Sequence, residues 1–505
     1  MTVATDSIQF GTINTGAPAD LLEDWSQIHW APIQEQVKRL QMRIAKAVRA
    51  GRWGKVKALQ RLLTRSFYGK LLAVKRVTEN KGKRTPGVDG KIWLTPASKR
   101  KAVVQIRHRG YSPLPLRRLY ILKSDGKKKR GLGIPSMSDR AMQALWVQAL
   151  QPVAETVADQ HSYGFRPYRS TADAIEQCFN VLATRNSAQW VLEGDIRSCF
   201  DEISHGWLLQ NIPMDKGILR SWLRAGYVED GILHETIAGT PQGGIASPTI
   251  ANMTLDGLEA AVYQSVGSTE YARRRSKINV IRYADDFVIT GCTKEVLEQR
   301  VQPAVARFLA DRGLDLSEEK TRIAHIEQGF DFLGQTVRKY GGKLLIKPSR
   351  KSIKALLDKV RAIVKANKAA EQAMLIRKLN SVIRGWANYH HHVVSSYVFN
   401  HVDNQIWHLL WRWAKRRHPN KSAAWIRKRY FHRIGNQNWV FAQGVSINTL
   451  FVGTKLFLAS SVAIKRHIKI RSNANPFDAQ WVDYFTQRRM RLRALTTLPG
   501  PLVGR

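Results

Sequence analysis

Cysteine is scarce in this chain. Only Cys178, Cys199 and Cys292 occur among 505 residues, and they lie far apart. Three widely spaced cysteines exclude a disulfide framework and a zinc site built on a CxxC pair. The same scarcity is typical of proteins kept in a reducing interior, so we expect a cytoplasmic location of the bacterial type.

Long apolar runs are also missing. The best candidate, residues 450–464, is interrupted by Lys455 and falls short of the roughly 18 apolar residues that a transmembrane helix needs. The first 16 residues lack a basic segment followed by an apolar one, so we expect no secretion signal. The sequence therefore predicts that the protein has no membrane partner.

Acidic residues are few beside the basic ones. Asp and Glu number 39 and Lys and Arg number 81, which gives a formal net charge of +42. The hydrophobic fraction of 44% is enough for packed cores, and the length favours roughly three domains. Because such an excess of positive charge repels itself, a polyanion is the simplest partner, with nucleic acid ahead of an anionic membrane surface.

Hydrophobic periodicity divides the chain into segments. It predicts helices over 32–63, Lys294–Arg312 and, as a basic three-helix unit, 350–415. Turn residues predict a hairpin around Asp125-Gly126. Strands are predicted at 190–195, at 279–290 as a hairpin, and as a pair within 321–347, and a Gly/Pro loop at 238–248 precedes a helix.

Two adjacent acids lie at the tip of the apolar hairpin NVIRYADDFVIT. They are Asp285 and Asp286, and Asp195 ends another predicted strand 90 residues earlier. Three carboxylates at one sheet edge form a hard-oxygen site that suits Mg²⁺, whose charge offsets their repulsion. Two such ions about 4 Å apart can activate a 3′-hydroxyl and stabilise a leaving pyrophosphate. The alternative is that this aromatic-x-Asp-Asp tetrapeptide occurs by chance and has no catalytic role.

Several ordered motifs resemble those of reverse transcriptases. YADD (283–286) is similar to their metal-binding box, GDIRSCFD (194–201) to their first acidic motif and TPQGGIASP (240–248) to their nucleotide-binding loop. The order of the motifs resembles group II intron-encoded reverse transcriptase/maturases in particular. LIRKLNSVIRGWANYH (375–390) resembles their thumb or X domain, and residues 465–481 resemble their DNA-binding region, so the resemblance covers nearly the whole chain beyond about residue 30.

The resemblance implies an α+β fold of the right-hand polymerase type. We expect a helical, RNA-binding N-terminal extension at 1–75, fingers and palm with an antiparallel sheet at 76–345, and a helical thumb or X maturase domain at 346–420. A small basic DNA-binding region is expected at 421–505. No cysteine follows Cys292, so no endonuclease domain of the HNH type is expected.

The resemblance also assigns the candidate catalytic residues. Asp195 and Asp285 match the principal ligands of two Mg²⁺ ions, assisted by the backbone carbonyl of Ile196. Asp286 matches a supporting acid. Lys320 matches a lysine that could protonate the departing pyrophosphate, although a lysine after two glutamates is more often simply exposed.

Candidate substrate-binding residues follow from the same motifs. Phe200 matches the ring that excludes a 2′-hydroxyl, Lys123 and Arg130 match the clamp on the triphosphate, and Gln242 matches a contact to the nucleotide sugar. Gly243 would let the backbone approach the substrate closely. Each assignment has an alternative. Phe200 could be an ordinary core residue, and Lys123 and Arg130 could belong to a solvated basic hairpin. Gln242 and Gly243 could form a tight structural turn.

The expected function is RNA-directed DNA synthesis joined to binding, splicing and copying of a group II intron. The expected partners are the intron RNA, target DNA and deoxynucleoside triphosphates. Two alternatives stay open: a splicing maturase without polymerase activity, and a reverse transcriptase of a defence or diversity-generating class. His390–His392 are expected at the surface or on RNA rather than at a metal. Core packing and base stacking remain equal readings for Trp411, Trp413 and Trp425.

Overall fold

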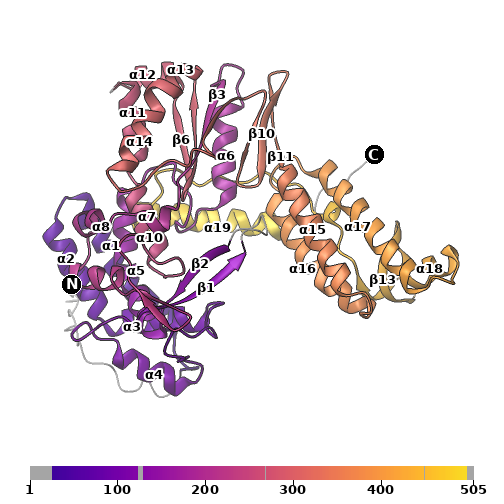
Figure 1. Ribbon diagram of the computed structural model, residues 1–505, viewed down its shortest axis with the longest axis horizontal. Helices are drawn as coiled ribbons and strands as arrows, with labels where there is room; N and C mark the ends of the chain where they lie inside the picture. The colour runs from indigo at the N-terminus through magenta and orange to yellow at the C-terminus, as the bar shows by residue number, and fades with distance from the viewer. Residues whose placement is uncertain (1–24, 123–128, 268, 448–449, 498–505) are drawn as a thin grey trace, which may run out of the picture.

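The computed structural model describes residues 25–122, 129–267, 269–447 and 450–497. In Figure 1 one group of helices lies at the lower left, a second at the upper left and a third at the right, and most of the strands lie between these groups. Within the described ranges no helix combines the length and the apolar character that a membrane crossing requires.

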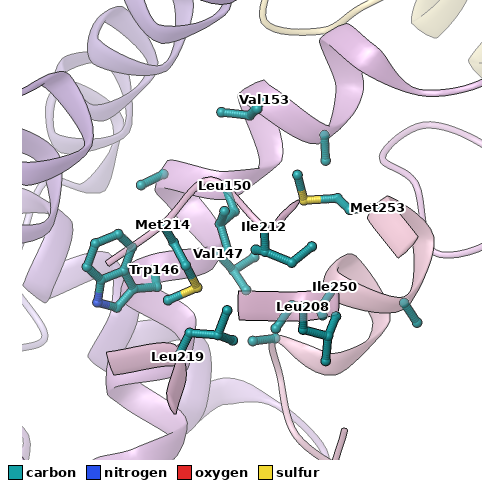
Figure 2. Close-up of a cluster of buried hydrophobic side chains, with 14 of the residues drawn as sticks. Trp146, Val147, Leu150, Val153, Leu208, Ile212, Met214, Leu219, Ile250 and Met253 are labelled. Atoms are coloured by element: carbon teal, nitrogen blue, oxygen red, sulfur yellow. The ribbon is translucent and has the colours of Figure 1, made fainter. Parts of the chain in front are cut away.

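Helices near the N-terminus pack around one long central helix. α1 (Trp30–Arg49), α2 (Trp53–Arg65) and α3 (Phe67–Glu79) contact α5 (Met137–Val157), and α4 (Pro96–Gln105) lies beyond α3. The predicted helical pattern over 32–63 is confirmed, and Gly51, at φ +66°, divides it into α1 and α2. Figure 2 shows Trp146, Leu150 and Val153 of α5 in the buried cluster.

The predicted basic hairpin exists as two antiparallel strands. β1 (Leu116–Leu122) pairs with β2 (Lys129–Ile134) on one side and with β4 (Tyr227–Glu229) on the other, and β5 (Ile232–His234) completes the sheet. The turn pair Asp125-Gly126 lies outside the described residues, as does Lys123.

A second sheet, which we call the central sheet, has the strand order β6-β7-β3-β8 and is antiparallel throughout. Its strands are β3 (Trp190–Asp195), β6 (Asn279–Tyr283), β7 (Asp286–Gly291) and β8 (Arg322–His325). Leu192 and Ile289 pack on one face and Val191 and Val288 on the other, so both faces are buried. The predicted strand at 190–195 and hairpin at 279–290 are confirmed.

Helices surround the central sheet. α6 (Thr171–Leu182) lies beside it in Figure 1, and α11 (Leu258–Val266) and α14 (Gln302–Ala310) lie on its other side. The predicted helix at 294–312 begins as α13 (Lys294–Val296) and passes through a π-helical turn, η2 (Leu297–Val301), before α14. The shorter helices are α7 (Cys199–Glu202), α8 (His205–Asn211), α9 (Lys216–Leu223), α10 (Ser247–Leu255) and α12 (Glu270–Ser276).

The region 321–347 holds more than the predicted strand pair. β8 joins the central sheet, whereas β9 (Phe330–Phe332), β10 (Gln335–Tyr340) and β11 (Lys343–Pro348) form a sheet of their own. Two tight turns, with Gly334 at φ +75° and Gly341 at φ +54°, allow three short strands to follow one another.

The predicted three-helix unit is confirmed. α15 (Arg350–Ala366), α16 (Gln372–His390) and α17 (Ser396–Arg417) form it, and it lies to the right in Figure 1. Their shared apolar core includes Leu356, Val360, Leu379, Ile383 and Val402, while lysines and arginines occupy the outer positions.

The last described segment returns from this unit to the central sheet. α18 (Ala423–Tyr430) and the sheet of β12 (Phe431–Ile434), β13 (Gln437–Ile447) and β14 (Leu450–Lys455) pack against the three helices. Two 3₁₀ turns, η3 (Ala459–Ser461) and η4 (Ala479–Trp481), precede α19 (Val482–Thr497). Asp173 of α6 accepts hydrogen bonds from His467 Nε2 at 2.8 Å and Arg488 at 3.2 Å, which dock this segment on α6.

Candidate active site

One edge of the central sheet carries all three predicted acids. The antiparallel register places Asp195, the last residue of β3, opposite Asp286, the first residue of β7. Tyr283 also pairs with Asp286, so the β6–β7 loop consists only of Ala284 and Asp285. The pairing of β3 with β7 therefore brings together acids that lie 90 residues apart in the sequence.

The two-residue loop is strained and is supported from behind. Ala284 has φ +57°, a conformation that side chains other than glycine rarely adopt and that is often found at functional sites. A Cβ atom on Gly164 would lie 2.4 Å from the nitrogen of Ala284, so only glycine permits this contact. Tyr163 N donates to Arg282 O at 2.8 Å, and Arg282 N donates to His161 O at 2.9 Å.

A buried arginine ties this loop to α10. The side chain of Arg282 is 1% exposed and donates to Asp256 Oδ1 at 2.6 Å and to Asn252 Oδ1 at 3.3 Å. Asn252 in turn donates to Gly164 O at 2.6 Å. Sequence reasoning missed Arg282, although a charged residue inside the apolar run VIRY is a signal that could have found it.

The carboxylates of this edge repel one another. Loss of hydration raises the pKa of Asp285, and the negative charge of Asp195 raises it further. The pKa of Asp286 is raised to about 7, first by loss of hydration and then by the charges of Asp285 and Asp195. Because these raised pKa values reflect the cost of placing several negative charges together, a bound cation would stabilise the ionised carboxylates.

Lys320 reaches the same edge. Its Nζ donates to both carboxylate oxygens of Asp195, at 2.8 Å each. The approach is fixed by the backbone, because Ser317 N donates to Asp195 O at 2.8 Å and Leu316 forms a bridge with Ile196. The segment that carries Lys320 therefore runs alongside the end of β3.

Phe200 and Gln242 line one cavity. Phe200 lies on α7, and its carbonyl accepts a hydrogen bond from Thr240 N at 2.6 Å. Gln242 Nε2 donates to Asp201 Oδ2 at 2.9 Å. Both residues line a cavity of about 350 Å³ together with Arg118 and Thr236.

Gly243 makes the close approach that its motif suggests, but to the protein's own backbone. It has φ +116°, and a Cβ atom there would lie 2.7 Å from the carbonyl oxygen of Gly133 in β2. Gly133 N donates to Gln242 O at 2.7 Å. The loop at 239–243 therefore joins α7 to β2 and sets the position of Gln242.

Arg130 lies on β2, opposite Ile121, and is exposed. Its positive charge lowers the pKa of Asp285 and that of Asp201, against the larger effect of burial, so it acts on both the acid edge and the cavity. Lys123, its predicted partner, lies outside the described residues.

The carboxylate oxygens at this edge suit a magnesium ion that the protein holds with only part of its ligands. Among the described residues, no group of three or more His, Cys, Asp or Glu side chains is arranged to hold a metal ion. Mg²⁺ commonly takes one or two carboxylates and completes its shell with water and substrate phosphates. The acid edge offers such carboxylates with raised pKa values, so the residues present fit this ion.

The prediction for the His triplet is wrong at His390. This side chain is fully buried, with Nε2 2.9 Å from Ser352 Oγ and Nδ1 3.1 Å from Gln335 Oε1. Burial lowers its pKa to about 3, and the pKa of His392 is lowered to about 4 by burial and by His467. His390 is the last residue of α16 and lies on its buried face, whereas His391 and His392 follow the helix end.

The aromatic residues of the C-terminal region differ in burial. Trp413 is 5% exposed and packs edge-on against Tyr430, so core packing describes it. Trp411 stacks on Trp407 with ring centroids 5.6 Å apart and lies against the same core. Trp425 is 37% exposed, and its ring contacts the ring of His418, with centroids 4.7 Å apart.

Three protein-family models match the chain. A model described as reverse transcriptase (RNA-dependent DNA polymerase) matches residues 121–337, which include every predicted site residue. The N-terminal domain of reverse transcriptase matches residues 25–106, and the group II intron, maturase-specific domain matches residues 353–431. The predicted α+β right-hand polymerase fold, with an antiparallel palm sheet and a helical thumb, is thereby confirmed.

Curated relatives agree with these matches. The group II intron-encoded protein LtrA of Lactococcus lactis subsp. cremoris is 29% identical over 372 residues, which cover 60% of this chain and 62% of LtrA. Protein YkfC of Escherichia coli (strain K12) is 32% identical over 359 residues, which cover 61% of this chain and 93% of YkfC. The matched part of this chain thus spans about three fifths of the length of LtrA.

Proposed function

The chain belongs to the family of group II intron-encoded reverse transcriptases and maturases, and we propose that it is an RNA-directed DNA polymerase that also assists intron splicing. It would bind group II intron RNA and copy it into DNA during retrohoming by target-primed reverse transcription. The observation that carries the proposal is the convergence of Asp195, Asp285 and Asp286 beside Lys320 on one sheet edge.

The acid edge would carry the transfer of a nucleotidyl group. Asp195 and Asp285, with the carbonyl of Ile196, would hold two Mg²⁺ ions, and Asp286 would support them. Bound ions of this kind activate the 3′-hydroxyl and stabilise the leaving oxygen. The 3′-hydroxyl would give its proton to solvent water as its oxygen bonds to the α-phosphorus, the bond to pyrophosphate would break, and Nζ of Lys320 would give its proton to the departing pyrophosphate.

The cavity beside Phe200 would receive the sugar of the incoming deoxynucleotide. A rigid aromatic ring beneath the sugar leaves no room for a 2′-hydroxyl, which would favour deoxynucleotides. Gln242 would contact the sugar, and Gly243 would keep this loop in place. Arg130 would bind the triphosphate, because its guanidinium matches phosphate oxygens in a fork, with Lys123 as a second positive charge.

We assign the remaining surfaces by domain. Residues 1–75 and 346–420 would bind intron RNA, 76–345 would form fingers and palm, and 421–505 would contact target DNA. The formal charge of +42 supports polyanionic partners, and the match to a maturase-specific domain at 353–431 supports intron RNA in particular. We place the protein with its nucleic acids in a bacterial-type cytoplasm.

Two separable activities can be tested with one variant. The double variant Asp285→Ala/Asp286→Ala should lose primer extension on RNA and keep protein-dependent splicing of the intron that flanks its gene, because the RNA performs the splicing chemistry. If the wild-type protein does not promote splicing of that intron at moderate salt, the maturase part of the proposal fails. If splicing is lost with the two acids, the two functions are not separable.

A further inference from the structure

Phe165 combines two unfavourable features. Its backbone has φ +56°, the left-handed region, which is unusual for a bulky side chain. The residue is 51% exposed to solvent. Neither feature helps the protein to fold, so the position of the ring calls for another explanation.

The backbone on both sides of Phe165 is firmly held. Gly164 lies against Ala284 so closely that no Cβ atom fits, and its carbonyl accepts a hydrogen bond from Asn252. On the other side, Arg166 makes two 2.9 Å hydrogen bonds to the carboxylate of Glu155, and both side chains are buried. Arg166 also donates to Asp159 O at 2.7 Å and to Ser162 O at 2.9 Å. These contacts hold the backbone of Phe165 in its strained conformation and leave the residue exposed.

The ring meets Phe200. The two ring centroids lie 6.3 Å apart with an interplanar angle of 78°, an edge-to-face contact. The backbone of Phe200 is held by Thr240, and its half-buried ring packs on the core from one side. Phe165 adds a contact from the loop that supports the Ala284–Asp285 turn. The same loop therefore touches both the acid edge and the aromatic ring of the cavity.

We propose that Phe165 is a positioning residue that holds the ring of Phe200 in place and thereby sets the selection of deoxynucleotides over ribonucleotides. This inference rests on the proposed polymerase function. A ring that excludes a 2′-hydroxyl works only if it cannot move aside, and an edge-to-face partner restricts that movement. From the usual strength of such a contact, its loss should lower selectivity about two- to tenfold.

The test is single-nucleotide primer extension on RNA, with kcat/KM measured for a deoxynucleotide and for the matching ribonucleotide. Phe165→Ala and Phe165→Gly should each lower the ratio of the two values about two- to tenfold, mainly through a lower KM for the ribonucleotide. Glycine adopts positive φ without strain, so Phe165→Gly removes the ring without adding strain at this position. Phe165→Tyr keeps the ring edge and should retain the wild-type ratio.

Tyr168 offers a matched control in the same loop. It too has positive φ, 61°, and is 54% exposed, but its ring packs on Phe485 of α19 with centroids 4.9 Å apart. Tyr168→Ala should leave sugar selectivity unchanged. In Phe200→Ala, which should accept ribonucleotides, the further change Phe165→Ala should have no additional effect, because its target ring is gone.

Failure of this inference can be told apart from failure of the proposed polymerase function. If Phe200→Ala loses selectivity and both Phe165→Ala and Phe165→Gly keep it, Phe165 does not position the ring and the inference is wrong. The same holds if Tyr168→Ala changes selectivity as much as Phe165→Ala does. If the wild-type protein extends no primer at all, it is the polymerase proposal that fails.

Discussion

Lys320 Nζ lies 2.8 Å from each carboxylate oxygen of Asp195, across 125 residues of sequence. The pair lies at the edge where Asp285 and Asp286 also converge, and the charge of Lys320 lowers the pKa values of both neighbours against the effect of burial. Under the proposed function, this lysine would give its proton to the leaving group.

Loss of this lysine should slow DNA synthesis. If Lys320 acts as a general acid, Lys320→Ala should lower the rate of nucleotide addition about 10²- to 10⁴-fold, the usual contribution of such a group. The measurement is single-turnover primer extension with saturating deoxynucleotide.

Arg322 provides a matched control for this prediction. It lies two residues further along, and its Nε donates to Glu193 of β3, just as Lys320 donates to Asp195. Arg322→Ala should change the rate only slightly. Equal losses in both variants would mean that Lys320 supports the strand rather than the chemistry.

Arg282 should contribute strongly to stability. Arg282→Leu leaves the carboxylate of Asp256 buried without its partner, which should lower the free energy of unfolding by about 3–5 kcal/mol. Urea unfolding at neutral pH measures this. Arg274→Leu breaks an exposed ion pair with Glu270, whose side chains are 78% and 62% exposed, and should cost at most about 1 kcal/mol. Similar losses in both variants would contradict a supporting role for Arg282.

Two glycines should respond to alanine in opposite ways. A Cβ atom on Gly194 would lie 2.1 Å from the buried ring of Phe287, so Gly194→Ala should destabilise the central sheet by about 1–3 kcal/mol and reduce activity. Gly385 in α16 has no atom within 4 Å of such a Cβ. Gly385→Ala should stabilise the protein by about 0.5–1 kcal/mol. Thermal unfolding of the two variants beside the wild type distinguishes these outcomes, and a stable Gly194→Ala variant would refute the first.

Stability should fall in mild acid through His390. Its pKa is about 3 in the folded protein against an ordinary value of 6.5, because burial disfavours the charged ring. Between these values the unfolded chain binds a proton that the folded chain does not, so the free energy of unfolding falls as pH decreases from about 6.5. The slope from this group is at most about 1.4 kcal/mol per pH unit.

His390→Gln should therefore flatten the dependence of unfolding free energy on pH between about 6 and 4, measured by urea titrations across that range. His391, which follows it in the sequence, serves as the control, and His391→Gln should keep the wild-type slope. An unchanged slope in His390→Gln would contradict the assignment of a buried neutral ring.

Local patterns predicted the elements whose residues repeat with a clear period. The hairpin at 279–290 alternates around a tight turn, and α15 to α17 place apolar residues at helical spacing, so both were accessible from sequence. The helical pattern over 32–63 was also accessible from sequence, but the break between α1 and α2 at Gly51 was not predicted. Patterns of single segments also did not reveal that β8 pairs with β3, whereas β9, β10 and β11, which follow it in the sequence, form a separate sheet.

The candidate site was accessible only in part for the same reason. The motifs predicted Asp195, Asp285, Phe200 and Gln242 as site residues, because these residues lie in recognisable strings of residues. The side-chain contacts of Arg282 and the contact between Phe165 and Phe200 join segments 26 residues or more apart in the sequence. Such relationships arise from the fold, so they became visible only in the structure.

The most direct measurement of the central claim is primer extension on an RNA template with deoxynucleotides and Mg²⁺, comparing the wild type with Asp285→Asn. Asp331→Asn controls for the loss of one negative charge. The Asp331 carboxylate is exposed and accepts a hydrogen bond from the hydroxyl of Thr336, which lies on β10. The wild type and Asp331→Asn should synthesise DNA, and Asp285→Asn should fall to background while remaining folded. Synthesis by Asp285→Asn at the wild-type rate, or none by the wild type, would contradict the claim.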